Sequence, residues 1–579
     1  MDMTLATDAV RLEVLKNALE GIADGMAMTV MRTARSSVVR QSTDFSTAIL
    51  SEKGDLIGQG FCLPPHMGGM VPALRAVKDR YEGKMLPGDM YVLNDPYEGG
   101  SHLPDIFVFK PVFHNKAIIS YVCAMAHHTD IGGRVAGGNA CDSTEIFQEG
   151  LRIPPVKLFE EGVPNETVFR ILEKAVRVPD IVMGDLAAQI AAIHYGEGEF
   201  LKLGERYGIE NLQQYAEELL DYTEQLTRAA IRKMPDGSWT FTDYIDDDGF
   251  DPGPIVITAT VTKQDDEITV DFTGTSPQCK GAIQPVFATT KAVVYAVLKT
   301  VLDNEIPNTS GYFRPVTITA PEGTIAYPML PAPVAARALG NLRIANAVFG
   351  AFAQMLPDVV YAAHAGSELG VGTGGYDKSK TPWKPWVLLE FHNEPGRGGM
   401  AARDGHDGVS AGITNQANVP AETIEAEHPV KVLEYNFVAD TEGAGLHRGS
   451  MGMVRAYEYT MADTVLQVRS DRQKYAPYGL HGGESSTTGS ITVTQDGKTR
   501  TMPSKFLMDV GEGDSIRVVW PGGGGWGDPK TRDPQMVLQD VIEEKITPER
   551  ATNVYCVVLT EDNVGIDWKE TEKLRSGKY

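Results

Sequence analysis

Imidazole and carboxylate side chains concentrate in two short segments of the chain, about twenty residues apart. The first reads NDPYEGGSHLPD (residues 94–105) and the second AHHTDIGG (residues 126–133). Each segment follows an apolar run, 90–94 and 118–126, that predicts a β-strand finishing in a polar loop. Nitrogen and oxygen ligands of this kind suit a borderline cation such as zinc, manganese or iron. The pattern therefore predicts a site for one divalent metal ion.

The spacing within each segment restricts which residues can share an ion. His102 and Asp105 could both reach one ion from a single Gly-flanked loop. On an extended strand, successive side chains point to opposite faces, so His127 and His128 cannot easily bind the same ion. One of these two histidines is expected to be a ligand. The other, together with Asp130 on the same side as His128, is expected to support the ligands or to carry protons.

A further ligand must come from another part of the chain. Residues 44–58 predict a β-hairpin with Asp44 at its mouth, and His66 lies in a Gly- and Pro-rich loop (63–69) that could face the same cavity. The competing interpretation is that these histidines and aspartates cap turns and satisfy buried backbone groups. A His-x-x-Asp pair alone occurs by chance in many proteins, but the second cluster favours the metal site.

Length, composition and charge exclude several classes of protein. At 579 residues, 42% hydrophobic and 22% charged, the chain can bury substantial cores and is expected to divide into about three or four domains. Its formal net charge of −24 and isoelectric point near 5.0 argue against nucleic acid or an anionic membrane as a partner, because both require a basic surface.

The cysteines and the amino terminus bear on the cellular compartment. The cysteines are odd in number, scattered and without a CxxC pair, which favours a reducing compartment: Cys62, Cys123, Cys141, Cys279 and Cys556. The amino terminus lacks the basic and apolar regions of a signal peptide, and no stretch approaches about 18 uncharged apolar residues. We therefore expect a cytoplasmic protein without a membrane span.

Hydrophobic periodicity predicts a multi-domain α+β protein. Helical spacing occurs over 8–35, 166–233 and 287–302, and strand-like alternation begins at 237. The chain from 331 onward is rich in glycine and reads mainly as strands and loops, with a helical or mixed tail. We expect an N-terminal α/β metal-binding domain, a helical segment, a β-rich domain with a helix, and a mainly β carboxy-terminal domain, at residues 1–165, 166–236, 237–330 and 331–579.

No motif for nucleotide binding or covalent catalysis is evident. The segment 520–528 (WPGGGGWGD) has neither the Lys-Ser/Thr end of a P-loop nor the spacing of a dinucleotide fingerprint, and 370–375 (GVGTGG) fails the same test. A tight loop packed by two tryptophans is the better interpretation of 520–528. The acidic run 246–248 reads as a solvated turn. No Gly-x-Ser-x-Gly elbow is present, and no Ser/His/Asp or Cys/His arrangement stands out.

Several segments resemble the signature blocks of the hydantoinase B family. The two metal-site segments carry the resemblance, and similar blocks follow along the chain: QEGLRIPP (148–155), ARDG (402–405), NVP (418–420), GLHRG (445–449), SDRQK (470–474), HGG (481–483) and PGGGGWGD (521–528). The family includes the B-type subunits of ATP-dependent N-methylhydantoinase and caprolactamase, the carboxy-terminal half of 5-oxoprolinase, and subunits of acetone and acetophenone carboxylases. The resemblance spans nearly the whole chain.

The resemblance implies a ligand set and a partner. In the family, two Asp and two His bind one metal, and on this chain they fall at Asp44, His102, Asp105 and His127. Proton transfer or the orientation of water is then expected of His128, Asp130 or His66. A structural role is expected of Glu149 and Arg152. ATP with Mg²⁺ is expected on a hydantoinase A-like partner subunit with an actin-like ATPase fold, in a hetero-oligomer.

The activity that the resemblance implies is ATP-dependent hydrolysis of a cyclic amide, namely a hydantoin, a lactam or 5-oxoproline. Phosphorylation of the amide oxygen on the partner gives an imidate-like species with a good leaving group, which metal-bound water of lowered pKa then attacks. One alternative is a subunit of an ATP-dependent ketone carboxylase of the acetone or acetophenone type, where the metal site stabilises an enolate. Another is a non-enzymatic scaffold. The chain length resembles that of stand-alone B-type subunits and favours amide hydrolysis.

Overall fold

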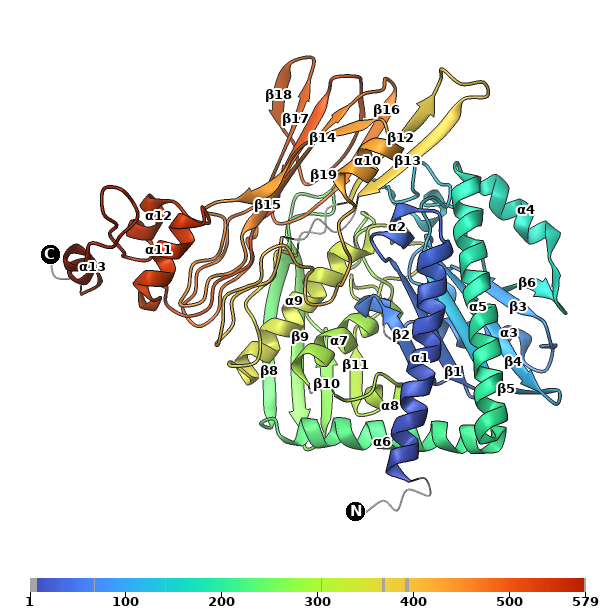
Figure 1. Ribbon diagram of the computed structural model, residues 1–579. Coiled ribbons are helices and arrows are strands. Elements are labelled where there is room, and N and C mark those ends of the chain that lie inside the picture. Colours follow the sequence, from blue (N-terminus) through green and yellow to red (C-terminus); the bar gives the residue numbers. More distant parts are fainter. Residues whose placement is uncertain are drawn as a thin grey trace.

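The computed structural model describes residues 8–66, 68–140, 142–302, 305–366, 370–390 and 395–576 (Figure 1). These residues form four β-sheets, of seven, four, four and five strands, with helices on and between them. The expected mixed α+β class is confirmed. Cys141, Met67 in the loop of His66, and the amino-terminal segment 1–7 lie outside the described residues. In the described part of the chain, no helix combines the length and the hydrophobicity needed to cross a membrane.

The N-terminal sheet contains the strands that flank both metal-site segments. Its pairings are all antiparallel, in the order β2-β1-β5-β4-β3-β6-β7. The predicted hairpin is β1 with β2, and the two predicted apolar strands are β3 and β5. The strands are β1 Phe45–Ser51, β2 Leu56–Cys62, β3 Met90–Leu93, β4 Asp105–His114, β5 Ala117–His127, β6 Val156–Glu160 and β7 Val163–Pro164.

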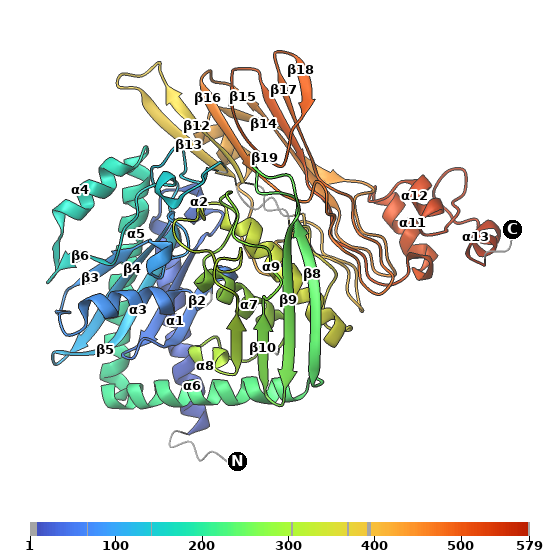
Figure 2. The same cartoon turned by 180° about the vertical axis from the view of Figure 1, so that it is seen from behind.

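The pleat of this sheet sends alternate residues into two separate hydrophobic cores. On one face, Ala124 of β5 packs with α1 (Ala9–Thr33) and α5 (Pro179–Tyr207). On the other face, Met125 packs with α3 (Met70–Tyr81). Figure 1 shows α1 and α5 in front of the sheet, and Figure 2 shows α3 on its opposite side. Because helices cover both faces, the central strands are apolar almost throughout.

The predicted helices before and after the sheet are confirmed. The amphipathic stretch 8–35 is α1, and the periodic stretch 166–233 contains three helices. One of them, α6, contacts both β2 of the N-terminal sheet and β10 of the next sheet, and it runs beneath both (Figures 1 and 2). It therefore bridges two parts of the fold. The helices of this region not yet described are α2 Ser37–Arg40, α4 Glu166–Ala175 and α6 Ile209–Arg232.

The central sheet has the order β11-β10-β9-β8, with β10 and β11 parallel and the other pairs antiparallel. Buried and partly exposed residues alternate along β9, because α9 covers only one of its faces and α7 packs against α9. The strand run from 237 and the helix at 287–302 are confirmed. The elements are β8 Gly237–Ile245, β9 Ile255–Gln264, β10 Glu267–Asp271, β11 Val316–Thr319, α7 Phe287–Val301, α8 Ser310–Phe313 and α9 Arg337–Met355.

Helix α9 corrects the sequence-based expectation of strands and loops after residue 331. All of its side chains except Ala338 and Gln354 are buried. A helix that is covered on every side has no one-sided hydrophobic stripe, so its sequence lacks the periodicity that predicts an amphipathic helix. Polar residues such as Arg343 also interrupt its apolar run. The correction bears on function, because α9 begins at Arg337, next to the predicted metal site.

The carboxy-terminal part contains two antiparallel sheets that pack face to face, in the orders β13-β12-β16-β19 and β14-β15-β20-β17-β18. Leu466 of one sheet and Val518 of the other belong to the same buried core. The elements are β12 Gly370–Asp377, β13 Lys384–Glu390, α10 Ala421–Glu427, β14 Val430–Val438, β15 Gly452–Tyr459, β16 Thr464–Arg469, β17 Ser490–Gln495, β18 Lys498–Thr501, β19 Lys505–Val510 and β20 Ser515–Val519. The predicted helical tail projects beyond them (Figure 1): α11 Pro534–Ile542, α12 Pro548–Asn553 and α13 Trp568–Arg575.

The glycine-rich segment 520–528 packs backbone against backbone. The amides of Gly523, Gly524 and Gly525 donate to carbonyls of neighbouring segments at 3.0, 2.8 and 2.9 Å. A Cβ atom added to Gly524 would lie 1.9 Å from the carbonyl oxygen of Tyr478, so only glycine permits this approach. These amides already have protein partners, which agrees with the sequence-based argument against a phosphate loop.

A buried network of charges joins α9 to the loop that follows β16. Arg343 donates hydrogen bonds to Asp471 at 2.5 Å and to Asp243 at 3.2 Å, and Arg472 donates to Asp243 at 3.0 Å. All four side chains are buried. Each charge therefore depends on its partners for compensation.

We expect Asp471→Asn to lower the free energy of unfolding by roughly 3–5 kcal/mol, because it leaves part of the Arg343 charge buried without its counter-ion. The control is Glu458→Gln, which breaks a largely exposed pair with Lys431 at 2.7 Å and should cost less than about 1 kcal/mol. Urea denaturation measures both. Equal stabilities of the two variants would contradict the prediction.

Candidate metal centre

Three residues at strand ends of the N-terminal sheet stand in one row. Asp105, the first residue of β4, pairs with His127, the last residue of β5. The pairing of β5 with β1 continues to Asp44, whose carbonyl accepts a hydrogen bond from the His127 amide at 3.0 Å. Residues opposite one another in neighbouring strands point to the same face of a sheet. The three side chains therefore project together, on the face that α3 covers.

His102 reaches this row from the loop between β3 and β4, and His66 reaches it from the single turn of 3₁₀ helix Pro64–His66. One ligand atom each from His102, Asp105 and His127 lie within 4.8 Å of one another, and so do atoms of Asp44, His66 and Asp105. All five side chains are buried. The structure thus brings together the four residues expected to bind a metal and adds His66 to them.

The ring of His102 is held in one orientation. Its Nδ1 donates to the carbonyl of Ala335 at 3.1 Å, which leaves Nε2 to face Asp105 Oδ1 at 3.2 Å. A carbonyl can only accept, so Nδ1 carries the proton and Nε2 has the lone pair. Glu149 in turn accepts from the amides of Val334 and Ala335 at 2.9 and 3.0 Å. These are the contacts of a residue that supports the loop behind a ligand.

His66 has one nitrogen directed at the cluster. Its Nδ1 lies 2.9 Å from the hydroxyl oxygen of Ser46, which is two residues beyond Asp44 in β1. Its Nε2 has no hydrogen-bond partner among the described residues. Burial lowers the pKa of His66 to about 3, so the ring is neutral at physiological pH. A neutral imidazole in this place can accept a proton at Nε2 or can ligate an ion.

Arg337 is a residue of the site that the sequence analysis missed. Its guanidinium donates to Asp105 Oδ2 at 2.5 Å, and the hydroxyl of Ser101 donates to the same oxygen. Burial alone would raise the pKa of Asp105, but His102 and Arg337 beside it outweigh that effect and hold the pKa well below its usual value. Arg337 is 232 residues away in sequence. The one sequence feature that could have indicated it is a lone arginine in the apolar stretch 332–339.

His128 and Asp130 lie outside this cluster. His128 faces α5, as strand alternation requires, and its Nε2 donates to the Gln189 side chain at 2.9 Å. Asp130 accepts from the Arg177 guanidinium at 3.0 Å and from the Gly137 amide at 3.0 Å. Arg152, expected to be structural, donates to Asp95 at 2.8 Å. These residues hold the end of β5 and the loops around it.

The donor set fits a divalent ion. Asp44 and Asp105 place two carboxylates in a buried region, and Arg337 compensates only one of their charges. Buried charges require a counter-charge, and a divalent cation would supply it. Mixed imidazole nitrogens and carboxylate oxygens suit zinc, manganese or iron.

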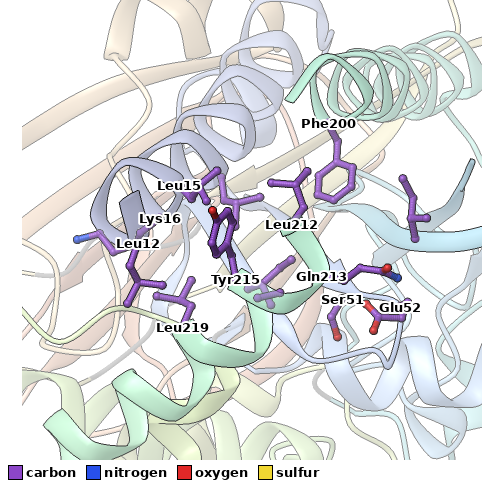
Figure 3. Close-up of a pocket in the computed structure, with 14 residues that line it drawn as sticks. Leu12, Leu15, Lys16, Ser51, Glu52, Phe200, Leu212, Gln213, Tyr215 and Leu219 are labelled. Carbon is purple, nitrogen blue, oxygen red and sulfur yellow. The ribbon is translucent and has the colours of Figure 1, made fainter. Parts of the chain in front are cut away.

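An inner cavity adjoins the cluster. It is lined by His66 and Ser101 together with small and apolar residues of α7, and its empty volume is about 270 Å³. A second pocket, drawn in Figure 3, lies between α1, α6 and the β1–β2 turn. Its lining is mainly apolar, with Leu15, Leu212 and Tyr215 among its residues, and it shares no residue with the cluster. The inner cavity is therefore the one that belongs to the candidate site.

Comparisons of the sequence match one family over nearly the whole chain. The sequence profile described as hydantoinase B/oxoprolinase matches residues 8–529. The B subunit of a putative D-/L-hydantoinase from Pseudomonas sp. (strain NS671) is 33% identical over 98% of this chain and 98% of its own length. The beta subunit of caprolactamase from Pseudomonas jessenii is 31% identical over 95% of this chain and 96% of its own length.

Comparisons of the structure agree with this match. The crystal structure of ATP-dependent caprolactamase from Pseudomonas jessenii superposes with a TM-score of 0.91 and 29% identity, over 99% of this chain and 100% of that chain. The nucleotide-free structure of acetone carboxylase also gives a TM-score of 0.91, at 18% identity, over 98% of this chain and 83% of that chain. At that lower identity the likeness shows a shared fold alone.

We expect Glu149→Ala to lower the free energy of unfolding by about 1–3 kcal/mol, because the amides of Val334 and Ala335 lose their buried acceptor. Glu149→Gln keeps an acceptor and should cost less than about 1 kcal/mol. Burial raises the pKa of Glu149 well above its usual value, so the native carboxyl group is neutral, as the amide is. Urea denaturation of the three proteins tests this. Equal losses in both variants would show that the acceptor is not what Glu149 contributes.

Proposed function

The chain belongs to the hydantoinase B/oxoprolinase family, and from that premise we propose that it is the metal-dependent subunit of a two-component, ATP-dependent cyclic amide hydrolase. Its substrate is a hydantoin, a lactam or 5-oxoproline. The observation that carries the proposal is the buried cluster at the strand ends, in which ligand atoms of His102, Asp105 and His127 lie within 4.8 Å of one another. The names of the hydantoinase and caprolactamase relatives support this substrate class.

In this proposal four side chains hold the ion: Asp44, His102, Asp105 and His127. When bound, the ion supplies a Lewis acid that polarises an oxygen atom and lowers the pKa of water. Ala335 fixes the His102 ring, and Arg337 with Ser101 fixes Asp105 through Oδ2. These contacts orient the ligands in advance and leave Asp105 Oδ1 directed at the cluster.

Proton transfer is assigned to His66. Of the three residues expected to move protons or to orient water, it is the one whose ring lies within the cluster. Its neutral ring has Nε2 available, and it borders the inner cavity. We assign His128 and Asp130 an indirect role, in which they hold β5 against α5 and the following loop in place.

Activation of the amide is assigned to a partner subunit. An amide is a poor electrophile because resonance delocalises its nitrogen lone pair, and phosphorylation of its oxygen creates a good leaving group. The hydantoinase and caprolactamase relatives are themselves named as single subunits, which supports a multi-subunit assembly. We therefore propose a hydantoinase A-like partner with an actin-like ATPase fold that binds ATP with Mg²⁺.

A ketone carboxylase subunit is the second candidate function. The observation that favours it is the fold shared with acetone carboxylase, at a TM-score of 0.91. The higher identity to hydantoinase and caprolactamase subunits, 33% and 31%, favours the amide hydrolase. The two activities differ in their need for bicarbonate, which provides a direct test.

We expect purified protein to contain about one divalent metal ion per chain, and His102→Ala and Asp105→Ala to lose most of it, because each removes a ligand. The matched control is His194→Ala, a half-exposed histidine on α5 that should leave the metal content unchanged. Elemental analysis measures all four proteins. Retention of metal in both ligand variants would sink the proposed site.

The activity assay uses the chain purified together with its partner subunit. We expect caprolactam, hydantoin or 5-oxoproline to be hydrolysed with consumption of ATP, and no turnover by the isolated chain. Consumption of acetone that requires bicarbonate would support the carboxylase instead. Turnover by the chain alone would overturn the need for a partner.

We expect His66→Gln to keep the metal and to lower kcat by about 10²–10⁴-fold, because glutamine can still bond to Ser46 but cannot carry a proton. Elemental analysis alongside steady-state kinetics of the assembled enzyme separates the two effects. Loss of metal in this variant would instead make His66 a ligand.

A further inference from the structure

An open cleft separates α3 of the N-terminal part from α7 of the central part. Its empty volume is about 1340 Å³, and its walls come from five stretches of chain: 68–75, 96–99, 286–295, 310–314 and 327–328. A volume of this size can admit a small-molecule ligand. The cleft is therefore a candidate entrance to the interior.

The cleft leads to the metal centre. Ala288 and Ala292 of α7 line both the cleft and the inner cavity. The inner cavity in turn reaches His66 and Ser101, and Ser101 donates to Asp105. A ligand in the cleft thus lies on a continuous path to the candidate ligands of the metal.

The charge of the cleft is opposite to that of the protein. Its lining includes Arg75, Lys291 and Arg314 and no acidic residue, although the chain has 77 acidic and 53 basic residues. Arg314 is paired with Asp221 at 2.7 Å. Among the described residues, neither Arg75 nor Lys291 has a salt bridge. Burial and the nearby Arg75 charge lower the pKa of Lys291, which places the two cations close to one another.

The walls beside these cations are flat and aromatic. Phe287 stacks on Tyr327 with ring centroids 4.4 Å apart, and Tyr295 stacks on Phe313 at 4.1 Å. The Lys291 ammonium lies 4.5 Å from the centre of the Phe287 ring. Two unpaired cations beside stacked rings form a surface that suits a planar organic anion.

We propose that this cleft binds the phosphorylated form of the amide substrate, with Arg75 and Lys291 holding the phosphate and the aromatic walls contacting the planar amide portion. The proposal rests on the proposed function, because the ATP-dependent partner supplies the phosphorylated amide. A dianionic phosphate relieves the repulsion between the two cations more fully than a single carboxylate does. The inner cavity then connects the bound amide to the metal centre.

The first test measures binding of phenyl phosphate, a stable planar phosphate ester, to the full chain by isothermal titration calorimetry. We expect Arg75→Gln and Lys291→Gln each to weaken binding at least about tenfold, because each removes a charge-assisted hydrogen bond. The matched control is Arg80→Gln, an exposed residue of α3 outside the cleft, which should bind like the wild type. Absence of phenyl phosphate binding, or equal loss in all three variants, would overturn the proposal.

Two further probes separate the chemistry of the ligand. Inorganic phosphate should bind more weakly than phenyl phosphate, because it lacks the ring that contacts the aromatic walls. Benzoate should bind at least about tenfold more weakly, because it has a single charge. Benzoate binding as tight as that of phenyl phosphate would assign the cleft to carboxylates and overturn the phosphate assignment.

The second test uses the assembled enzyme. Arg75→Gln and Lys291→Gln should retain metal and ATP hydrolysis but should form less hydrolysed amide per ATP consumed, because the phosphorylated amide escapes. Unchanged coupling would overturn the proposal. Failure of the wild-type enzyme to hydrolyse any cyclic amide would instead overturn the proposed function, and phenyl phosphate binding by the isolated chain would still report on the cleft.

Discussion

The pleat of the N-terminal sheet is the constraint on which the candidate metal centre depends. Asp44, Asp105 and His127 share a face only because their strands pair in this register. A shift of β5 by one residue would turn His127 toward α5 and bring His128 into the row. The register is held by apolar residues on both faces, where Ala124 and Met125 enter different cores. Hydrophobic packing away from the site thus decides which histidine can meet the ion.

Much of this site could be predicted from the sequence, because it lies at the ends of strands whose apolar runs are easy to recognise. The hairpin of Asp44 and the loop of His102 follow from local patterns alone. The choice of His127 over His128 does not, since strand alternation separates the two rings without showing which helix covers which face. Arg337 and α9 were out of reach for another reason. A helix buried on all sides has no periodic stripe, and its contact with Asp105 joins distant parts of the chain.

Electrostatics organise the molecule at two scales. The chain has a formal charge of −24, which repels anions at long range and weakens within about a Debye length. Inside that envelope, positive charge gathers at particular points, with Arg337 against Asp105 and Arg75 beside Lys291 in the cleft. The carboxy-terminal glycine-rich layer contributes in a different way, because its backbone packing joins strands and loops without side chains.

The dependence of His102 on Ala335 and of Asp105 on Arg337 has a consequence for how the protein is made. Synthesis on the ribosome proceeds from the amino terminus, so the strands of the first sheet emerge more than two hundred residues before the segment that completes the site. An ion that meets the nascent chain finds ligands without their final orientation. Selection of the metal therefore takes place in the finished protein, after α9 has been translated and docked, and reflects the ions available to it then.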